Sequence, residues 1–104
     1  MRFGRVEGVV TPLAEAGETR LQLTVYLETG SRLEVVREEV LAPLRPLTTT
    51  ADLIWHADQF TQETIGGDLA EKGWEVIGGG EPPPPEPGEL ARSATYAVRH
   101  FGSS

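Results

Sequence analysis

The sequence of 104 residues contains no cysteine, no asparagine and a single lysine, Lys72. Without cysteine the chain cannot form disulfides, iron–sulfur clusters, thiolate zinc sites or cysteine nucleophiles. Long apolar runs are also missing: none approaches the roughly 20 residues of a membrane-spanning helix. The N-terminus has no apolar core like that of a signal peptide. We therefore expect a cytoplasmic protein that does not associate with membranes.

Positive charge is scarce and unevenly distributed. Nine basic residues stand against 16 acidic ones, so the formal net charge is −7. Residues 1–47 carry six Arg and seven Glu, whereas residues 48–89 carry one Lys and nine acids, a net of −8. No basic stripe exists to neutralise phosphates, which disfavours direct nucleic-acid binding. The acidic segment instead suits a basic protein partner.

What is present is an ordinary globular composition, with 38% hydrophobic residues and 12 glycines. A chain of this length is expected to form one domain with one modest core, so residues 1–104 are taken as a single domain.

The first third of the chain has the pattern of β-strands. Residues 20–28 (RLQLTVYLE) alternate strictly, with four aliphatic side chains on one face and polar ones on the other. A tight turn at Gly30 and resumed alternation through Leu33 and Val35 predict a hairpin over residues 20–37. Residues 2–10 form a weaker strand, and residues 11–19, with Pro12 and Gly17, are expected to be a polar connection.

The period then changes to that of a helix. Pro43 and Pro46 predict an irregular crossover over residues 38–48, with aliphatic side chains placed on the core: Val40, Leu41, Leu44 and Leu47. Thr49 and Asp52 have capping-box spacing, and apolar residues then recur at steps of three and four. At Gly66 and Gly67 we expect the helix to kink or end, or the backbone to lie close on the sheet.

The remaining segments complete the sheet. Gly73 is a natural left-handed helix cap, and residues 74–78 and 94–101 are strands that pair most simply with each other. Between them, residues 81–89 form an exposed proline-rich loop. The predicted fold is α+β: an antiparallel sheet of about five strands, ordered β-β-β-α-β-β, with one long helix on one face. We expect the other face to meet a second copy of the chain in a homodimer.

Two motifs in the second half, LAEKGWEVI at residues 69–77 and YAVR at residues 96–99, carry a resemblance to a known group. They resemble a family of small bacterial and phage domains of unknown function, whose pattern is a helix ending in L-x-x-x-G-W-E followed by two strands. The resemblance covers residues 60–101. It implies a helix lying on a hairpin and supplies no catalytic residues.

The helix carries a polar stripe of Asp52, His56, Gln59 and Glu63. A histidine with two carboxylates could hold a metal or act in acid–base chemistry, but a helix needs a solvated face in any case. An exposed Trp55 beside this stripe would anchor a partner, whereas Trp74 is expected in the core. The residues proposed for partner binding are Trp55, Asp58, Glu63 and Asp68.

A second candidate site lies on the outward face of the predicted sheet. Arg and Tyr side chains there could stack on a base and pair with a phosphate, although a half-solvated sheet looks the same. The proposed ligand-binding residues are Arg20, Tyr26, Arg32, Tyr96 and Arg99. No glycine-rich phosphate loop, G-x-S-x-G motif or catalytic triad is evident.

Three hypotheses of function follow. The first is a non-enzymatic interaction protein, such as a phage or mobile-element accessory protein that binds and inhibits a host defence protein through its acidic surface; mimicry of DNA is one form of this. The second is an oligomer that binds or sequesters a small nucleotide signal. The third is a small metal-dependent enzyme using His56 and neighbouring acids. We favour the first, with no cofactor and with a protein partner.

Overall fold

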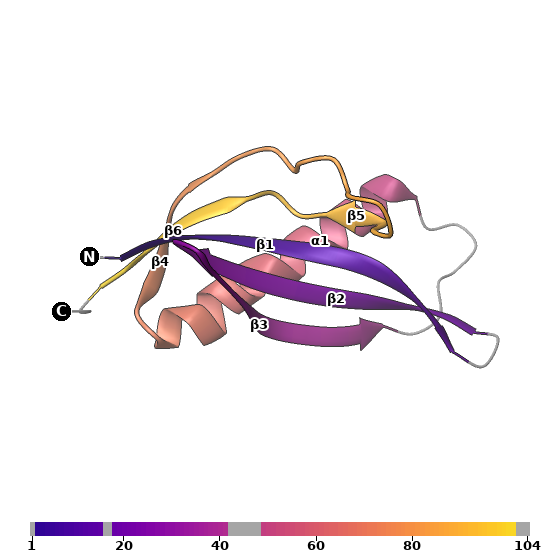
Figure 1. Cartoon of the computed structure of the whole chain (residues 1–104), viewed down its shortest axis with the longest axis horizontal. Coiled ribbons are helices and arrows are strands. Elements are labelled where there is room, and N and C mark those ends of the chain that lie inside the picture. Colours follow the sequence, from indigo (N-terminus) through magenta and orange to yellow (C-terminus); the bar gives the residue numbers. More distant parts are fainter. Residues whose placement is uncertain (1, 16–17, 42–48, 102–104) are drawn as a thin grey trace.

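The computed structural model describes residues 2–15, 18–41 and 49–101, which form one antiparallel sheet with a long helix on one face (Figure 1). The α+β prediction and the order of elements are confirmed, with one short additional strand. Along the chain the elements are β1 (Arg2–Glu15), β2 (Glu18–Thr29), β3 (Arg32–Leu41), α1 (Thr50–Thr64), the π-helical turn η1 (Ile65–Leu69), β4 (Trp74–Gly79), β5 (Ala91–Arg92) and β6 (Tyr96–His100).

The sheet places the first strand and the last strand beside each other. Its strand order is β3-β2-β1-β6-β4, with β5 pairing with β1 next to β6. The predicted pairing of the last strand with residues 74–78 is confirmed, because β6 pairs with β4. On its other side β6 pairs with the start of β1, where Arg2 lies opposite His100.

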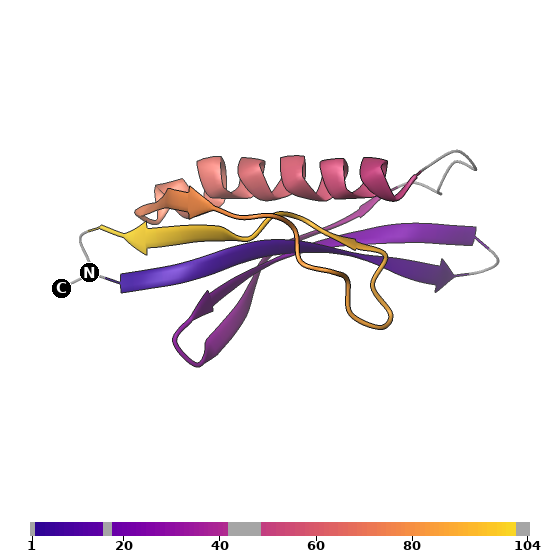
Figure 2. The same ribbon diagram turned by 90° about the horizontal axis from the view of Figure 1, so that it is seen from above.

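The core lies between the sheet and α1, which covers one face (Figure 2). The aliphatic face predicted for residues 20–28 points into it. Gly8 allows close approach, since a Cβ atom there would lie 2.2 Å from Thr61 Oγ1. The buried core cluster includes Val6, Val10, Leu23, Val25, Leu27, Leu53, Phe60, Leu69, Trp74 and Val98.

The helix begins where the sequence predicts. The Thr49 hydroxyl accepts from the Asp52 backbone N–H at 3.2 Å, and the Asp52 carboxylate accepts from the Thr49 N–H at 3.2 Å. The α-helix ends at Thr64, just before the glycine pair, and the helical segment continues. It widens into η1, where a Cβ atom on Gly66 would meet nothing within 4 Å. Gly73, with φ of +93°, ends the helical segment as expected.

The polar connection predicted for residues 11–19 is wrong for its described residues, because β1 continues to Glu15 and β2 begins at Glu18. Pro12 lies opposite Leu21 in this ribbon. In the described residues, β1 beyond Val10 pairs with β2 alone, so this end is a sheet edge. A proline is tolerated at an edge because its missing N–H would not have joined a second ladder.

The crossover predicted from residue 38 is also wrong at its start, since β3 runs to Leu41. Val40 is half exposed rather than placed on the core, because it lies opposite Gln22, on the polar side of β2. Leu44 and Leu47 lie outside the described residues. A bulge at Val36 moves Leu33 and Val35 to the same side as Tyr26, where both are exposed.

We call the sheet face opposite α1 the open face. The β2–β3 turn and residues 80–90 both project on this side (Figure 2). Residues 80–86 join no strand, and Pro83 is half-buried while the other prolines of the segment are exposed. This segment therefore lies outside the sheet, with most of its residues exposed. Among the described residues, no helix has the length and apolar composition needed to cross a membrane.

Candidate functional site

The structure does not bring the five proposed ligand-binding residues together. Tyr26 lies on the open face, whereas Tyr96 points to the helix side, opposite Val6 of the core face. Arg32 begins β3 beside the hairpin turn, and Arg20 lies toward the far end of β2, opposite Leu13. Arg99 pairs with Glu75 across β6 and β4, with Nε donating to Oε1 at 2.7 Å. The predicted constellation is therefore divided among separate places.

Tyr96 has a structural role beneath α1. Its hydroxyl donates to Asp58 Oδ1 at 2.7 Å and accepts from Gln62 Nε2 at 3.0 Å. Burial, together with the hydrogen bond to Asp58, raises the pKa of Tyr96. Asp58 Oδ1 also accepts from the backbone N–H of Ala94 at 3.2 Å. Asp58 thus ties α1 to the segment before β6, and both of its carboxylate oxygens already accept hydrogen bonds within the chain.

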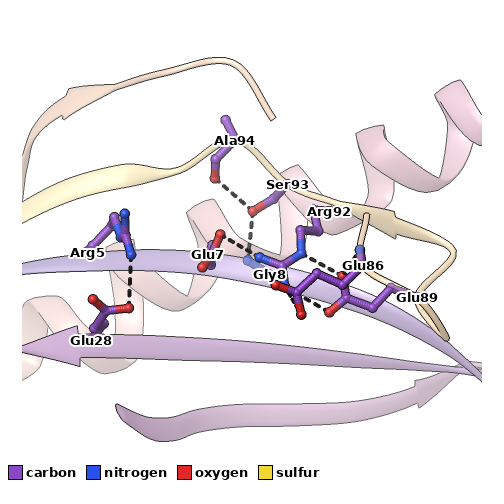
Figure 3. Close-up of polar contacts among 9 residues, drawn as sticks. All are labelled: Arg5, Glu7, Gly8, Glu28, Glu86, Glu89, Arg92, Ser93 and Ala94. Atoms are coloured by element: carbon purple, nitrogen blue, oxygen red, sulfur yellow. Dashed lines mark hydrogen bonds and ion pairs between the residues drawn. The ribbon is translucent and has the colours of Figure 1, made fainter. Parts of the chain in front are cut away.

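The open face does contain a hollow, between the β2–β3 turn and the proline-rich loop, with a volume of about 440 Å³. Tyr26 lines it together with two arginines that are not among the proposed ligand-binding residues, Arg5 and Arg92. Both are already paired with carboxylates, as Figure 3 shows. Four glutamates line the same hollow: Glu7, Glu28, Glu86 and Glu89. With twice as many carboxylates as guanidiniums, this hollow is poorly suited to a phosphate.

Arg92 is the centre of the polar cluster on this face (Figure 3). Its Nε and Nη2 donate to the two carboxylate oxygens of Glu89 at 2.6 and 2.9 Å, and Nη1 donates to Glu7 at 3.2 Å. Glu86 approaches Nη2 at 3.6 Å. The hydrogen bond from Arg92 lowers the pKa of Glu89, and the hydrogen bond to Glu89 raises the pKa of Arg92. This cluster holds the end of the proline-rich loop against β1.

The other proposed partner-binding residues are accessible. Trp55 is 59% exposed on the outer side of α1, and its indole ring meets the His56 ring edge-on, with centroids 5.1 Å apart. Glu63 and Asp68 are both exposed, Glu63 near the end of α1 and Asp68 in η1. Trp74 is buried, as predicted.

A recess beside Trp55 joins the helix to the edge strand β3. Its volume is about 270 Å³ and its floor is formed by Leu23 and Phe60, both buried. The rim consists of Trp55, His56, Gln59 and Glu63 from α1 together with Glu39 from β3. Three members of the polar stripe found in the sequence therefore face a real hollow. Glu39 was not predicted, because only strand pairing places it opposite Leu23.

The fourth member of the stripe, Asp52, is held at the helix N-terminus. The hydrogen bonds from the Thr49 backbone and hydroxyl lower the pKa of Asp52. Across the described ranges, no group of three His, Asp or Glu side chains lies close enough to hold a metal ion. The recess thus combines one indole, two carboxylates and an apolar floor.

Comparison with protein-family models, with curated proteins and with solved structures finds no match to this chain. The resemblance of residues 60–101 to small bacterial and phage domains stays a prediction.

Proposed function

We propose that this chain is a non-enzymatic interaction protein that binds a basic segment of a partner protein in the recess between α1 and β3. The observation that carries the proposal is the exposed indole of Trp55 beside two carboxylates, Glu39 and Glu63, above a floor of Leu23 and Phe60.

These groups match the side chains of arginine and lysine. A cation is attracted to the face of an indole ring, and the attraction strengthens as water is excluded. The aliphatic stem of an Arg or Lys can lie on an apolar floor while its charged head reaches the carboxylates. Trp is also enriched among the residues that dominate binding energy at protein interfaces. The recess therefore suits one inserted basic side chain.

The chain's own Arg37 shows the same chemistry at the edge of this region. Its guanidinium carbon lies 4.6 Å from the Phe60 ring centroid, and its Nη2 is 3.9 Å from Glu39 Oε2. Both side chains are more than one-third exposed, so this long ion pair contributes little stability. Glu39 can exchange Arg37 for a partner's cation at small cost.

The acidic balance of the chain supports a basic partner. With a net charge of −7, the protein attracts basic surfaces during diffusional encounter. Inhibition of a host defence protein by a phage or mobile-element accessory protein is an interaction of this kind. We propose it as the biological role of the binding. A nucleotide-binding oligomer is less favoured, since the arginines of the open-face hollow are already neutralised by glutamates.

The test uses a tetra-arginine peptide as the probe and the two tryptophan indole N–H signals of the labelled protein as the readout. We expect the Trp55 signal to shift on titration while that of the buried Trp74 stays in place. Replacing both carboxylates, in Glu39→Gln/Glu63→Gln, should weaken binding by about tenfold, because two of the attracting charges are lost.

The matched control is Glu71→Gln/Glu81→Gln, which removes the same charge from exposed positions outside the recess. This variant should bind within about twofold of the wild type. Equal weakening by both double variants would show that the peptide senses net charge alone, and the proposed recess would be wrong. If the Trp55 signal does not shift, the proposed recess would also be wrong.

A further inference from the structure

We infer that residues 81–87 (EPPPPEP) form a preorganised polyproline ligand, presented to an aromatic-lined groove on a partner protein. This surface is separate from the α1–β3 recess, and neither proposal depends on the other.

The covalent structure of the segment restricts it to an extended conformation. Each proline ring fixes its own φ near −65°, and every residue that precedes a proline is driven out of the helical region. Residues 81–84 and residue 86 each precede a proline. Nearly every backbone angle in the segment therefore favours the polyproline II helix, which has three residues per turn.

In a helix with three residues per turn, every third residue lies on the same edge, so the segment has three edges. The structure shows which of these edges faces inward. Pro83 is the half-buried proline, and Glu86, three residues later, reaches Arg92. The prolines on the other two edges are exposed: Pro82 with Pro85, and Pro84 with Pro87. Two parallel P-x-x-P ridges thus point away from the protein, which is the arrangement that polyproline-binding grooves accept.

Both ends of the segment are held to the sheet. At the start, the Gly80 N–H donates to the Thr95 carbonyl at 3.0 Å. At the end, the Glu89 N–H donates to the Glu86 carbonyl at 3.0 Å around Gly88, whose φ of +91° suits a tight turn with proline before it. The Glu86 N–H donates in return to the Glu89 carboxylate at 2.8 Å.

Because of that turn, Glu86 and Glu89 both contact Arg92. Arg92 in turn contacts Glu7 of β1 (Figure 3). A ligand fixed in its bound conformation loses little conformational entropy on binding. A loop that served only to keep the protein in solution would need neither the fixed turn nor the ion cluster. The chemistry of the partner follows from the ridge: stacked aromatic side chains that accept proline rings, as in SH3, WW and EVH1 domains.

The experiment titrates the isotope-labelled full chain with a purified SH3 domain, a WW domain and an EVH1 domain. We expect at least one of the three to bind, with signal changes confined to residues 80–90 and their neighbours. Replacing one of the two exposed proline pairs, in Pro82→Ala/Pro85→Ala, should weaken that binding by about tenfold. Pro83→Ala alters the inward edge and should leave it within about twofold.

The outcomes are distinct. Failure of all three domains to bind would overturn the proposal, as would binding that maps to another surface. Equal weakening by Pro83→Ala would overturn the assignment of the edges. None of these results bears on the α1–β3 recess, which is tested by a different probe.

Discussion

Gly8 determines how closely α1 lies on the central strand. A Cβ atom at this position would come within 2.2 Å of Thr61 Oγ1 and 3.3 Å of the Ala57 carbonyl oxygen. Thr61 cannot turn away freely, since its hydroxyl donates to Ala57 at 2.7 Å and its side chain is fully buried. We expect Gly8→Ala to lower the free energy of unfolding by about 1–3 kcal/mol, as overpacking does. Urea unfolding followed by tryptophan fluorescence measures it.

The control is Gly66→Ala, where an added methyl group would meet nothing within 4 Å. Alanine is favoured over glycine in helical backbone by about 1 kcal/mol, so this variant should be as stable as the wild type or more so. In a Thr61→Ala background, Gly8→Ala should cost less, because the nearest atom is gone. A full loss in both backgrounds would contradict the steric explanation.

At the scale of elements, Arg92 and Arg99 allow a comparison between a partly buried ion cluster and a more exposed ion pair. Arg92 is 14% exposed and holds three glutamates, whereas Arg99 is 36% exposed and pairs with Glu75. We expect Arg92→Met to destabilise the fold by about 2–4 kcal/mol, because Glu7 and Glu89 would be left as partly buried charges. Arg99→Met should change stability by less than about 1 kcal/mol.

Thermal unfolding of the two arginine variants and the wild type checks this difference. Because Arg92 anchors the end of the proline-rich loop, Arg92→Met should also increase proteolytic cleavage within residues 80–90. Equal stability of the two variants would mean that the loop is not held by the cluster.

For the whole molecule, the glutamate held by Arg92 predicts how stability responds to acid. The pKa of Glu89 is lowered in the folded state by the hydrogen bond from Arg92. A lowered pKa contributes stability above the unfolded value, and this contribution is lost as the pH falls through the folded value. We therefore expect stability to decline as the pH falls below about 4.5, the ordinary range for a glutamate.

Urea midpoints measured between neutral and acid pH test this response. Glu89→Gln should be less stable than the wild type at neutral pH, and the difference should shrink as the wild-type carboxylate is protonated. Glu81→Gln, at an exposed position of the same loop, should follow the wild-type curve. A constant difference between Glu89→Gln and the wild type would contradict the linkage.

Homodimerisation also belongs to the whole molecule and stays a prediction. The open face carries exposed apolar side chains in Phe3, Leu33 and Val35, which are 59%, 62% and 52% exposed. We expect a second copy to cover them, so native mass spectrometry should detect a dimer that Leu33→Lys dissociates. Ile77→Lys, an equal change on the edge strand β4, should leave the dimer intact. If the protein is monomeric at every concentration measured, the homodimer is excluded.

The acidic surplus is not a single surface on one side of the sheet. Glu63, Asp68 and Glu71 lie with the helix, whereas Glu86 and Glu89 fold toward Arg92 on the open face. Glu75 is paired with Arg99. Several of the nine acids counted between residues 48 and 89 are thus committed to ion pairs. Sequence arithmetic could not show this, because their partners come from distant parts of the chain.

Local chemistry was sufficient for the elements themselves. The alternation in residues 20–28, the capping box at Thr49 and the positive φ at Gly73 each depend on a few neighbouring residues, so the sequence alone predicted β2, the start of α1 and the end of the helical segment. The stiffness of residues 81–87 is likewise a property of consecutive prolines.

Tertiary structure alone decided which side chains meet. Strand pairing brought Glu39 to the recess beside Trp55, and a bulge at Val36 moved Leu33 to the open face. The packing of α1 over the start of β6 made Asp58 the hydrogen-bond partner of Tyr96. A sequence determines periodicity and capping through contacts between near neighbours, whereas register and layer packing depend on contacts between residues far apart in the chain, which no local pattern contains.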